Sequence, residues 1–264
     1  MKSKGKDRLS SLPDSILTEI LSLLPINSAA ATSVLSHRWR HLWTGVTRLK
    51  FKFESEDREF STVTDHIMGK LTSPKLTVFD VYVYVDGDVA ESTFHEICRR
   101  NVEEIRVTYY ALISIPCCVF RCESLVILDL YEGDHITCHL TLNESNKSIN
   151  LPNLKMLRLC LYDNARYLLK TLFRCCPMLE ELALKLDFDE DEHFVDISAP
   201  NLKVLSISMF LDLLQTGRSK IVIDAPALQK LYITNPSSIC YFVTNPTMLV
   251  EAHMDSDPCR ACEV

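Results

Sequence analysis

The sequence predicts an α/β protein in which a small all-helical head precedes an irregular solenoid built on a parallel sheet. Residues 12–43 carry apolar side chains at helical spacing, and one short apolar phrase recurs from residue 74 to near the end of the chain. The balance of charge also changes between these two parts. We therefore expect a head over residues 1–53 and a solenoid of about seven to eight repeats over residues 54–264.

The composition is that of an ordinary globular protein, with 47% hydrophobic and 24% charged residues among 264. The apolar run from Ile16 to Leu24 contains Glu19 and is too short for a membrane span, which needs roughly 18 to 20 apolar residues. No apolar secretory segment follows the basic residues at the start. We expect a nuclear or cytoplasmic protein without membrane contact, in which the eleven cysteines are thiols.

Charge is divided unevenly along the chain. Residues 1–53 hold nine Lys and Arg against three Asp and Glu, which leaves 19 of the 28 cations and 32 of the 35 anions for the remainder. A basic head favours an acidic protein or a nucleic acid as its partner. Because the cations are scattered along the head and do not cluster, we expect a protein partner and no nucleic acid.

The head should contain three short helices. Pro13 suits the first position of the first helix and Pro25 ends it, while Asn27 and Ser36 are residue types that cap the next two. Apolar residues of the first helix cover an arc of roughly 160°, wider than the roughly 100° of a surface helix. A unit of about forty residues cannot enclose that surplus. We expect a partner to cover it; the alternative is packing against the rest of the chain.

The recurring phrase has the form L-x-x-L-x-L, usually with proline two residues before it. Its copies lie 21 to 29 residues apart, the period of leucine-rich repeats, and begin at Leu76, Val102, Leu125, Leu154, Leu179, Leu202, Leu228 and Leu249. Each copy predicts a short strand whose alternate residues point inward, so that successive copies stack into a parallel sheet. Helices or loops should connect the strands, and residues 167–175 have helical spacing.

Three phrases of the head stand in a distinctive order: Leu12-Pro13-Asp14-Ser-Ile16-Leu17, Ile20-Leu-Ser-Leu-Leu-Pro25 and Val34-Leu-Ser-His-Arg38-Trp39. With the downstream phrases Phe120-Arg-Cys122-Glu-Ser-Leu and Cys176-Pro-Met-Leu-Glu-Glu-Leu, they make the chain resemble the plant-type F-box/leucine-rich-repeat family. Many relatives continue into a C-terminal FBD domain, whereas this chain stops at Val264. We expect a member that lacks that domain, either naturally short or truncated.

The resemblance implies that the head docks on a small acidic Skp-type adaptor and, through it, on a cullin-RING ubiquitin ligase. The residues expected at that contact are Leu12, Pro13, Ile16, Leu17, Ile20, Leu21, Val34, Leu35, Arg38 and Trp39. The implied function is recruitment of a protein client for ubiquitination. The alternative is a binding scaffold, or a truncated F-box protein, without ligase output.

A client site is expected on the face of the sheet that points away from the core. Between the inward residues of each strand lie outward ones, several of them Tyr or Arg, the residue types that anchor protein interfaces. The residues expected to contact the client are Tyr82, Tyr84, Arg106, Tyr110, Tyr131, Arg158 and Tyr162. The alternative is that these rings only cover neighbouring strands.

The sequence contains no recognisable catalytic site. Its six glycines form no phosphate loop, and neither a nucleophile elbow nor an HExxH motif occurs. His37 with His41, the histidines and cysteine of residues 135–139, and Cys259 with Cys262 each lack a full set of metal ligands. Residues 187–192 begin like a calcium loop but depart from it, and are expected to be a solvated acidic loop. We expect no enzyme activity, no cofactor and no metal.

Overall fold

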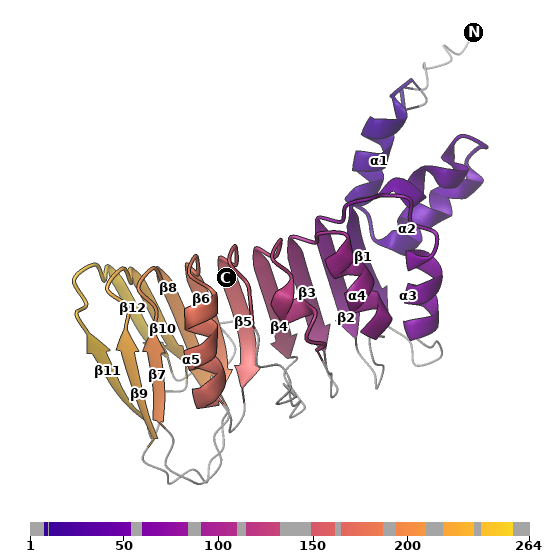
Figure 1. The fold of residues 1–264 in the computed structure, drawn as a ribbon. Helices are drawn as coiled ribbons and strands as arrows, with labels where there is room; N and C mark the ends of the chain where they lie inside the picture. The colour runs from indigo at the N-terminus through magenta and orange to yellow at the C-terminus, as the bar shows by residue number, and fades with distance from the viewer. Residues whose placement is uncertain are drawn as a thin grey trace.

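The computed structural model describes residues 8–9, 11–53, 60–83, 91–109, 115–132, 149–161, 165–186, 194–209, 219–234 and 239–255. The head consists of two α-helices and two 3-10 helices: α1 (Asp14–Ser22), α2 (Ile26–Ala31), η1 (Thr32–Val34) and η2 (Trp39–Gly45). Figure 1 shows the head at one end of a long row of strands. The fold class predicted from the sequence, a helical head followed by a repeat solenoid with a parallel sheet, is confirmed.

The helix ends of the head differ in detail from the prediction. Helix α1 begins at Asp14, directly after Pro13, and α2 begins at Ile26, so Asn27 lies inside α2 and does not cap it. The fixed backbone of Pro25 takes the cap position instead. The third predicted helix is the 3-10 helix η2, which begins at Trp39 and has no side-chain hydrogen bond at its cap position.

Within the described ranges, nine parallel strands form the main sheet, in the order β1-β2-β3-β4-β5-β6-β8-β10-β12. They are β1 (Arg48–Phe53), β2 (Val78–Val83), β3 (Glu104–Tyr109), β4 (Ile127–Glu132), β5 (Met156–Leu161), β6 (Glu181–Leu186), β8 (Val204–Met209), β10 (Lys230–Thr234) and β12 (Glu251–Asp255). The eight predicted strands are present, each beginning two residues after the first apolar residue of its phrase. Strand β1 was not predicted.

The register of the sheet places equivalent residues of the repeats side by side, which gives the solenoid a continuous core. One inward row runs through Leu49, Phe79, Ile105, Leu128, Leu157, Leu182, Leu205, Leu231 and Ala252. All of these except Ala252, on the edge strand, are buried. Because each inward side chain lies beside its equivalents on the adjacent strands, stacking of the repeats keeps the row buried.

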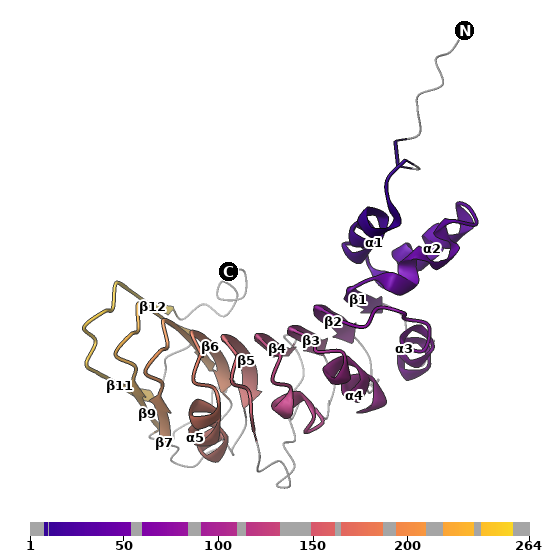
Figure 2. The ribbon, with the colours of Figure 1, turned by 45° about the horizontal axis from the view of Figure 1, so that its top comes forward.

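The layer behind the main sheet is helical in its first part and a second sheet in its last part. It begins with helices, namely α3 (Phe60–Met68), α4 (Glu91–Arg99), η3 (Val119–Arg121) and α5 (Ala165–Cys175), and ends with a three-stranded parallel sheet made of β7 (Phe194–Ser198), β9 (Ser219–Asp224) and β11 (Ile239–Thr244). Figure 2 shows this layer on the outer side of the curved main sheet. The helix predicted over residues 167–175 is confirmed, but β7, β9 and β11 replace expected helices or loops.

Backbone hydrogen bonds join each repeat to the one before it just ahead of the strands. The N–H of Thr77 donates to the carbonyl of Thr47, and equivalent bonds link Glu103 to Thr77 and Val126 to Glu103. The same pattern continues through Lys155, Glu180, Lys203, Gln229 and Val250. In two Pro-Asn-Leu phrases the amide of Asn153 or Asn201 also donates to a carbonyl of the preceding repeat. The main sheet is thus fixed in register where its strands begin.

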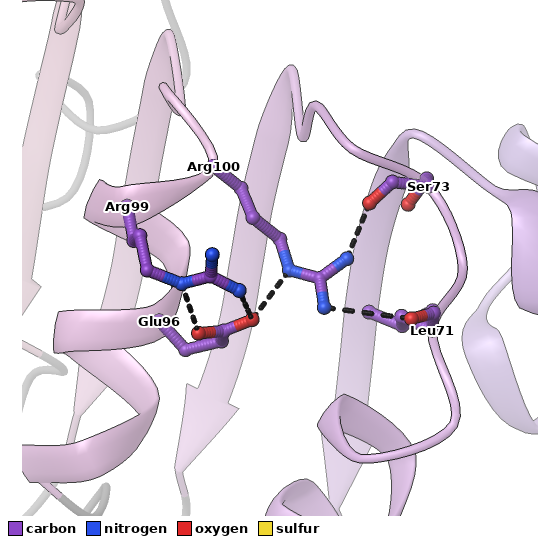
Figure 3. Close-up of polar contacts among 5 residues, drawn as sticks. All are labelled: Leu71, Ser73, Glu96, Arg99 and Arg100. Atoms are coloured by element: carbon purple, nitrogen blue, oxygen red, sulfur yellow. Dashed lines mark hydrogen bonds and ion pairs between the residues drawn. The ribbon is translucent and has the colours of Figure 1, made fainter.

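The head is fastened to the solenoid through the segment that precedes β2. The N–H of Thr72 donates to the carbonyl of Thr44 in η2 at 2.8 Å. Arg100, whose side chain is 11% exposed, holds that segment from the other side: it binds Glu96 on α4 at 2.7 Å and donates to the carbonyls of Ser73 and Leu71 (Figure 3). Head and solenoid also share one hydrophobic core. They are joined by packing as well as by chain connection.

Candidate protein-interaction surfaces

Helix α1 divides its apolar residues between the core and the surface. Leu17 and Leu21 are buried, with exposed fractions of 0% and 1%. Ile16 and Ile20, their neighbours in sequence, are exposed at 46% and 38%. Residues four apart lie on the same face of a helix, so these two pairs define two adjacent apolar faces. Among the described residues, the face of Leu17 and Leu21 is covered and that of Ile16 and Ile20 is exposed.

The head exposes several other large apolar side chains besides those of α1. We call this set of exposed residues the head patch; its members are Leu9, Pro13, Ile16, Ile20, Leu23, Leu24, Val34 and Leu35. Val34 is 85% exposed and Leu35 is 64% exposed. Isolated apolar residues are common on protein surfaces, but several large ones on a unit this small indicate a contact site.

Arg38 brings the two chain segments of the head patch together. Its Nε donates to Asp14 Oδ1 at 2.7 Å, and its Nη2 donates to the carbonyl of Leu12. These contacts fasten the start of α1 to the turn between η1 and η2. The side chains of Arg38 and Asp14 are 38% and 63% exposed, so water screens their ion pair and its main effect is positional.

The structure changes the roles of some residues expected at the adaptor contact. Pro13, Ile16, Ile20, Val34, Leu35 and Arg38 are exposed, and Leu12 is partly buried. Leu17, Leu21 and Trp39 are buried in the core of this chain, where they support the exposed residues from beneath, and their place at the adaptor contact stays a prediction. Leu9, Leu23 and Leu24 are exposed but were not expected there; the wide apolar arc of the first helix already contained the last two.

A second feature is a row of alternating charges on the outward face of the main sheet. The register places Lys50 beside Asp80, Asp80 beside Arg106, Arg106 beside Asp129, and Asp129 beside Arg158. We call these five residues the charged row. Asp129 Oδ2 lies 3.6 Å from Arg106 Nη1 and 3.3 Å from Arg158 Nη1. Figure 2 shows that this face of the sheet is its concave side.

Burial works against the charge of both aspartates in the charged row. It raises the pKa of Asp129, although Arg158 and Arg106 oppose the shift. The pKa of Asp80 is also raised by burial, against the effect of Lys50, Arg106 and Arg48. Asp129 is only 7% exposed, and its Oδ1 has no hydrogen-bond partner among the described residues. The row is therefore a set of mutually neutralised charges and not a free cationic surface.

The residues expected to contact the client fall into two groups. Tyr82 is half-buried on the concave face, and Arg106 and Arg158 lie in the charged row, where both contact Asp129. Tyr131 is in β4, but its side chain is outside the described part, as are Tyr84, Tyr110 and Tyr162 altogether. At the far end of the concave face, Tyr232 stacks on His253 with ring centroids 5.6 Å apart. That pair was not named from the sequence, although Tyr232 lies at an outward position of its phrase.

The described residues contain no group of three or more His, Cys, Asp or Glu side chains placed to hold a metal ion. His37 and His41 are exposed on the head. Residues 135–139, 187–192 and 259–262 lie outside the described ranges. Within the part of the chain that is described, no helix is both long and apolar enough to cross a membrane.

Comparison with known proteins identifies both parts of the chain. Residues 9–51 match the F-box domain, and residues 90–248 match the family described as FBD-associated F-box protein At5g56370, LRR repeats. The F-box/FBD/LRR-repeat protein At5g56420 of Arabidopsis thaliana is 30% identical over 265 residues, covering 95% of this chain and 60% of its own length. The F-box/FBD/LRR-repeat protein At3g51530 of the same plant is 33% identical, covering 94% of this chain and 55% of its own length. The chain thus spans between half and two thirds of these relatives.

Proposed function

The chain belongs to the family of F-box proteins with leucine-rich repeats, and on that premise we propose that it recruits a protein client to a ubiquitin ligase. The head binds a Skp-type adaptor, which connects it to a cullin-RING ligase, and the solenoid binds the client. The chain itself transfers no ubiquitin and needs no cofactor. Its place of action is the nucleus or the cytoplasm.

The head patch is the observation that carries this proposal. Large aliphatic side chains contribute about 1.5 to 3 kcal/mol each when a partner buries them fully. The patch lies on the head, whose residues 1–53 have an excess of Lys and Arg, so its partner should combine apolar residues with acidic ones. A small acidic adaptor meets both conditions. Nucleic acid does not, because most of the patch is apolar.

Proximity is the mechanism that this arrangement supports. A client held on the solenoid shares one complex with the ubiquitin-charged enzyme, which raises the effective concentration of the reacting groups. Such an effect requires a defined geometry between the two binding sites. The shared core and the hydrogen bonds of Thr72 and Arg100 give the head a fixed attachment to the solenoid.

We propose the concave face of the main sheet as the client site. Tyr82 provides an aromatic side chain there, and in the sequence Tyr84, Tyr110, Tyr131 and Tyr162 stand within or just after the strand phrases of the repeats. Tyrosines supply contact area at a low cost in conformational entropy. Arg106 and Arg158 contribute polar contacts at the edge of this area while they remain paired with Asp129.

Adaptor binding can be tested with two matched charge insertions. Ile20→Asp places a charge in the head patch, where an unpaired charge in an apolar contact costs several kcal/mol, so affinity for a Skp-type adaptor should fall by more than about a hundredfold. Val250→Asp is the control, since Val250 is 86% exposed at the other end of the molecule. Binding should be measured by calorimetry with both variants shown to be folded. Equal affinity of both variants for the adaptor would contradict the proposal.

The client site has its own test. Replacing Tyr82, Tyr110 and Arg158 together by Ala should release the client but keep the adaptor, since a hot-spot residue typically contributes about 2 kcal/mol. The control replaces Lys170 and Arg174, both exposed on α5 of the outer layer, by Ala. Clients are identified by affinity purification and mass spectrometry with the unmodified chain. Retention of the client by the triple variant would move the site to another face.

A scaffold without ligase output remains the second candidate function. It would share adaptor and client binding with the leading proposal. The two differ in whether the client is turned over, so client half-life should be followed with and without Ile20→Asp. A half-life that does not change on loss of adaptor binding would favour the scaffold.

A further inference from the structure

The two edges of the main sheet differ in how they are covered. At the first edge, α2 contacts β1, and the inward residues Leu49 and Phe51 are 0% and 3% exposed. At the last edge, β12 has a hydrogen-bonded neighbour on one side only among the described residues, namely β10. Figure 2 shows β12 in the part of the molecule opposite the head. Within the described ranges, the main sheet is therefore open at β12.

Apolar residues at this open edge are exposed, although their equivalents in earlier repeats are buried. Met254 continues the inward row of Ile207 and Ile233, which are each 1% exposed, but Met254 itself is 64% exposed. Ala252 is exposed as well, and Val250, which directly precedes β12, is 86% exposed. An exposed edge strand with alternating apolar residues is a template for pairing with a further strand.

The backbone of β12 also directs hydrogen-bonding groups away from β10. The N–H of Glu251 donates to the carbonyl of Gln229, the residue before β10. Successive residues of a strand direct their N–H and C=O groups to opposite sides, so those of Ala252 and Met254 point to the open edge. β12 contains neither proline nor lysine, the residue types that commonly keep such an edge from pairing. A further strand can therefore form a regular ladder there.

Charged side chains on the outward face of β12 restrict which strand can pair with it. Glu251 Oε2 lies 3.3 Å from Lys230 Nζ, and Glu251 Oε1 lies 2.9 Å from His253 Nε2. His253 in turn stacks on Tyr232 with an angle of 2° between the rings. Hydrogen bonds from Lys230, and then from His253, lower the pKa of Glu251. A fitting strand must therefore place a donor opposite the Glu251 carboxylate and an acceptor opposite His253.

We propose that this strand is β12 of a second copy of the chain, paired antiparallel about a two-fold axis at Ala252. Glu251 then lies opposite the partner's His253, and His253 lies opposite the partner's Glu251. A carboxylate has about four acceptor positions, so Glu251 can accept from the partner's His253 while it keeps Lys230 and its own His253. The contact is self-complementary, as a two-fold interface requires.

The same register also matches the apolar side of the strand. Val250 faces the partner's Met254, so the two residues left exposed in one chain cover each other in the pair. The two neighbouring registers that keep this side apolar place Glu251 opposite the partner's Asp255 or opposite the partner's Glu251. Like charges directly opposite each other are destabilising, so both of these registers are disfavoured.

In the dimer, the two main sheets form one continuous sheet with a head at each end. The contact lies away from the head patch and does not depend on the proposed ligase function (Figure 1). Loss of the dimer should therefore leave the affinity for an adaptor unchanged.

Analytical ultracentrifugation of the full chain tests the dimer. With rising concentration, the average mass should increase from 30.2 kDa towards twice that value. Met254→Asp places a carboxylate on the apolar side of the contact and should weaken self-association by more than about tenfold. Met178→Asp is the matched control, since Met178 is 47% exposed and precedes an interior strand, β6. It should leave self-association unchanged.

Glu251 and His253 provide a test of the register. His253→Glu brings two carboxylates opposite each other, and Glu251→Lys brings a lysine opposite a histidine, so each variant alone should be monomeric. An equimolar mixture should form a heterodimer, because the introduced lysine of one chain then faces the introduced glutamate of the other. Native mass spectrometry distinguishes the heterodimer from the two homodimers.

Several results would overturn the proposal. One is a chain that stays monomeric at every concentration, and another is a mixture of the two charge variants that forms no heterodimer although circular dichroism shows both to be folded. A third is self-association that is lost with Ile20→Asp and kept with Met254→Asp, because the contact would then lie on the head patch.

Discussion

The solenoid buries the apolar side chains of its inward row, whereas the head leaves several of its large apolar side chains exposed. In the solenoid, the side chains of the inward row from Leu49 to Leu231 are buried, and each repeat covers apolar side chains of the repeat before it. In the head, Ile16 and Ile20 remain exposed beside the buried Leu17 and Leu21. A solenoid can bury its core by adding repeats, but a unit of four short helices has no such means. In the described part of the chain, the head thus keeps an exposed apolar face, which is the face that we propose binds the adaptor.

Charged residues show the reverse pattern. The ion pair of Arg38 and Asp14 in the head is open to water, whereas Asp129 in the solenoid is buried between Arg106 and Arg158. Charge on the concave face is thus largely neutralised within the protein. Specific binding on that face then depends on aromatic side chains and on the shape of the surface more than on net charge. The head, in contrast, combines its apolar patch with an excess of Lys and Arg in residues 1–53.

The largest expected effect comes from truncating the core of the solenoid. Phe79 is fully buried, with its ring 5.9 Å from Phe51 and 6.2 Å from Phe94. Phe79→Ala should lower the free energy of unfolding by about 3 to 5 kcal/mol, because a cavity remains. Leu35→Ala in the head patch should change it by less than about 0.5 kcal/mol. Urea unfolding measures both, and equal losses would show that Leu35 is buried in solution.

Much of the fold could be predicted from the sequence, since the phrase L-x-x-L-x-L marks strands by the spacing of inward residues alone. Strand β1 was missed because Leu49 and Phe51 alternate within residues 1–53, which were expected to be helical, and no proline or repeat phrase marks them. The second sheet was missed for a different reason. Val195 with Ile197, and Ile221 with Ile223, alternate as buried β-branched residues, which is a signal for strands and not for the helices expected between repeats.

The binding surfaces were less predictable than the fold. Helical spacing indicates that α1 has more apolar residues than one face can hold, but it does not decide which face turns inward. That choice depends on η2, which packs against α1, and so on contacts between segments distant in sequence. Likewise, the alternation along β4 and β5 indicates that Asp129 and Arg158 point outward, but their pairing follows from the register between strands.

The next effect in size concerns the connection between the two regions. Arg99 and Arg100 both bind Glu96, but the side chain of Arg99 is 72% exposed and that of Arg100 is 11% exposed (Figure 3). Arg100→Ala should cost about 2 kcal/mol, because it removes a charged donor from buried carbonyls, whereas Arg99→Ala should have a much smaller effect, because water screens its ion pair. Denaturant unfolding compares them. A larger loss for Arg99 would contradict the assigned roles.

A fall in pH should weaken the connection between the head and the solenoid, because Glu96 becomes protonated. Hydrogen bonds from Arg99, and then from Arg100, lower the pKa of Glu96 from 4.5 to about 2. A carboxyl group whose pKa is lower in the folded state stabilises the fold above its unfolded pKa, and this contribution is lost as the pH falls. The stability difference between the unmodified chain and Glu96→Gln should therefore stay constant above about pH 5.5 and shrink between pH 4.5 and 2. A difference that persists at pH 2 would mean that Glu96 acts through packing.

The smallest expected effect tests the buried ion pairs of the solenoid against the exposed one of the head. Asp14→Asn removes a water-exposed pair and should change the free energy of unfolding by less than about 1 kcal/mol at any pH.

Asp129→Asn removes a carboxylate whose pKa is raised above 3.8 by burial. A raised acid pKa means that the folded state holds its proton more tightly than the unfolded state, so Asp129 favours folding at low pH and loses that advantage as the pH rises through its folded pKa. At pH 7 the cost of burying its charge opposes the attraction of Arg106 and Arg158, and these effects nearly cancel in buried pairs. We therefore expect Asp129→Asn to change stability by less than about 1 kcal/mol at pH 7 and to reduce the decline in stability between pH 4 and 7, as measured by urea unfolding across that range. A loss of several kcal/mol at pH 7 would show instead that the two arginines outweigh burial and that the charged row holds the concave face together.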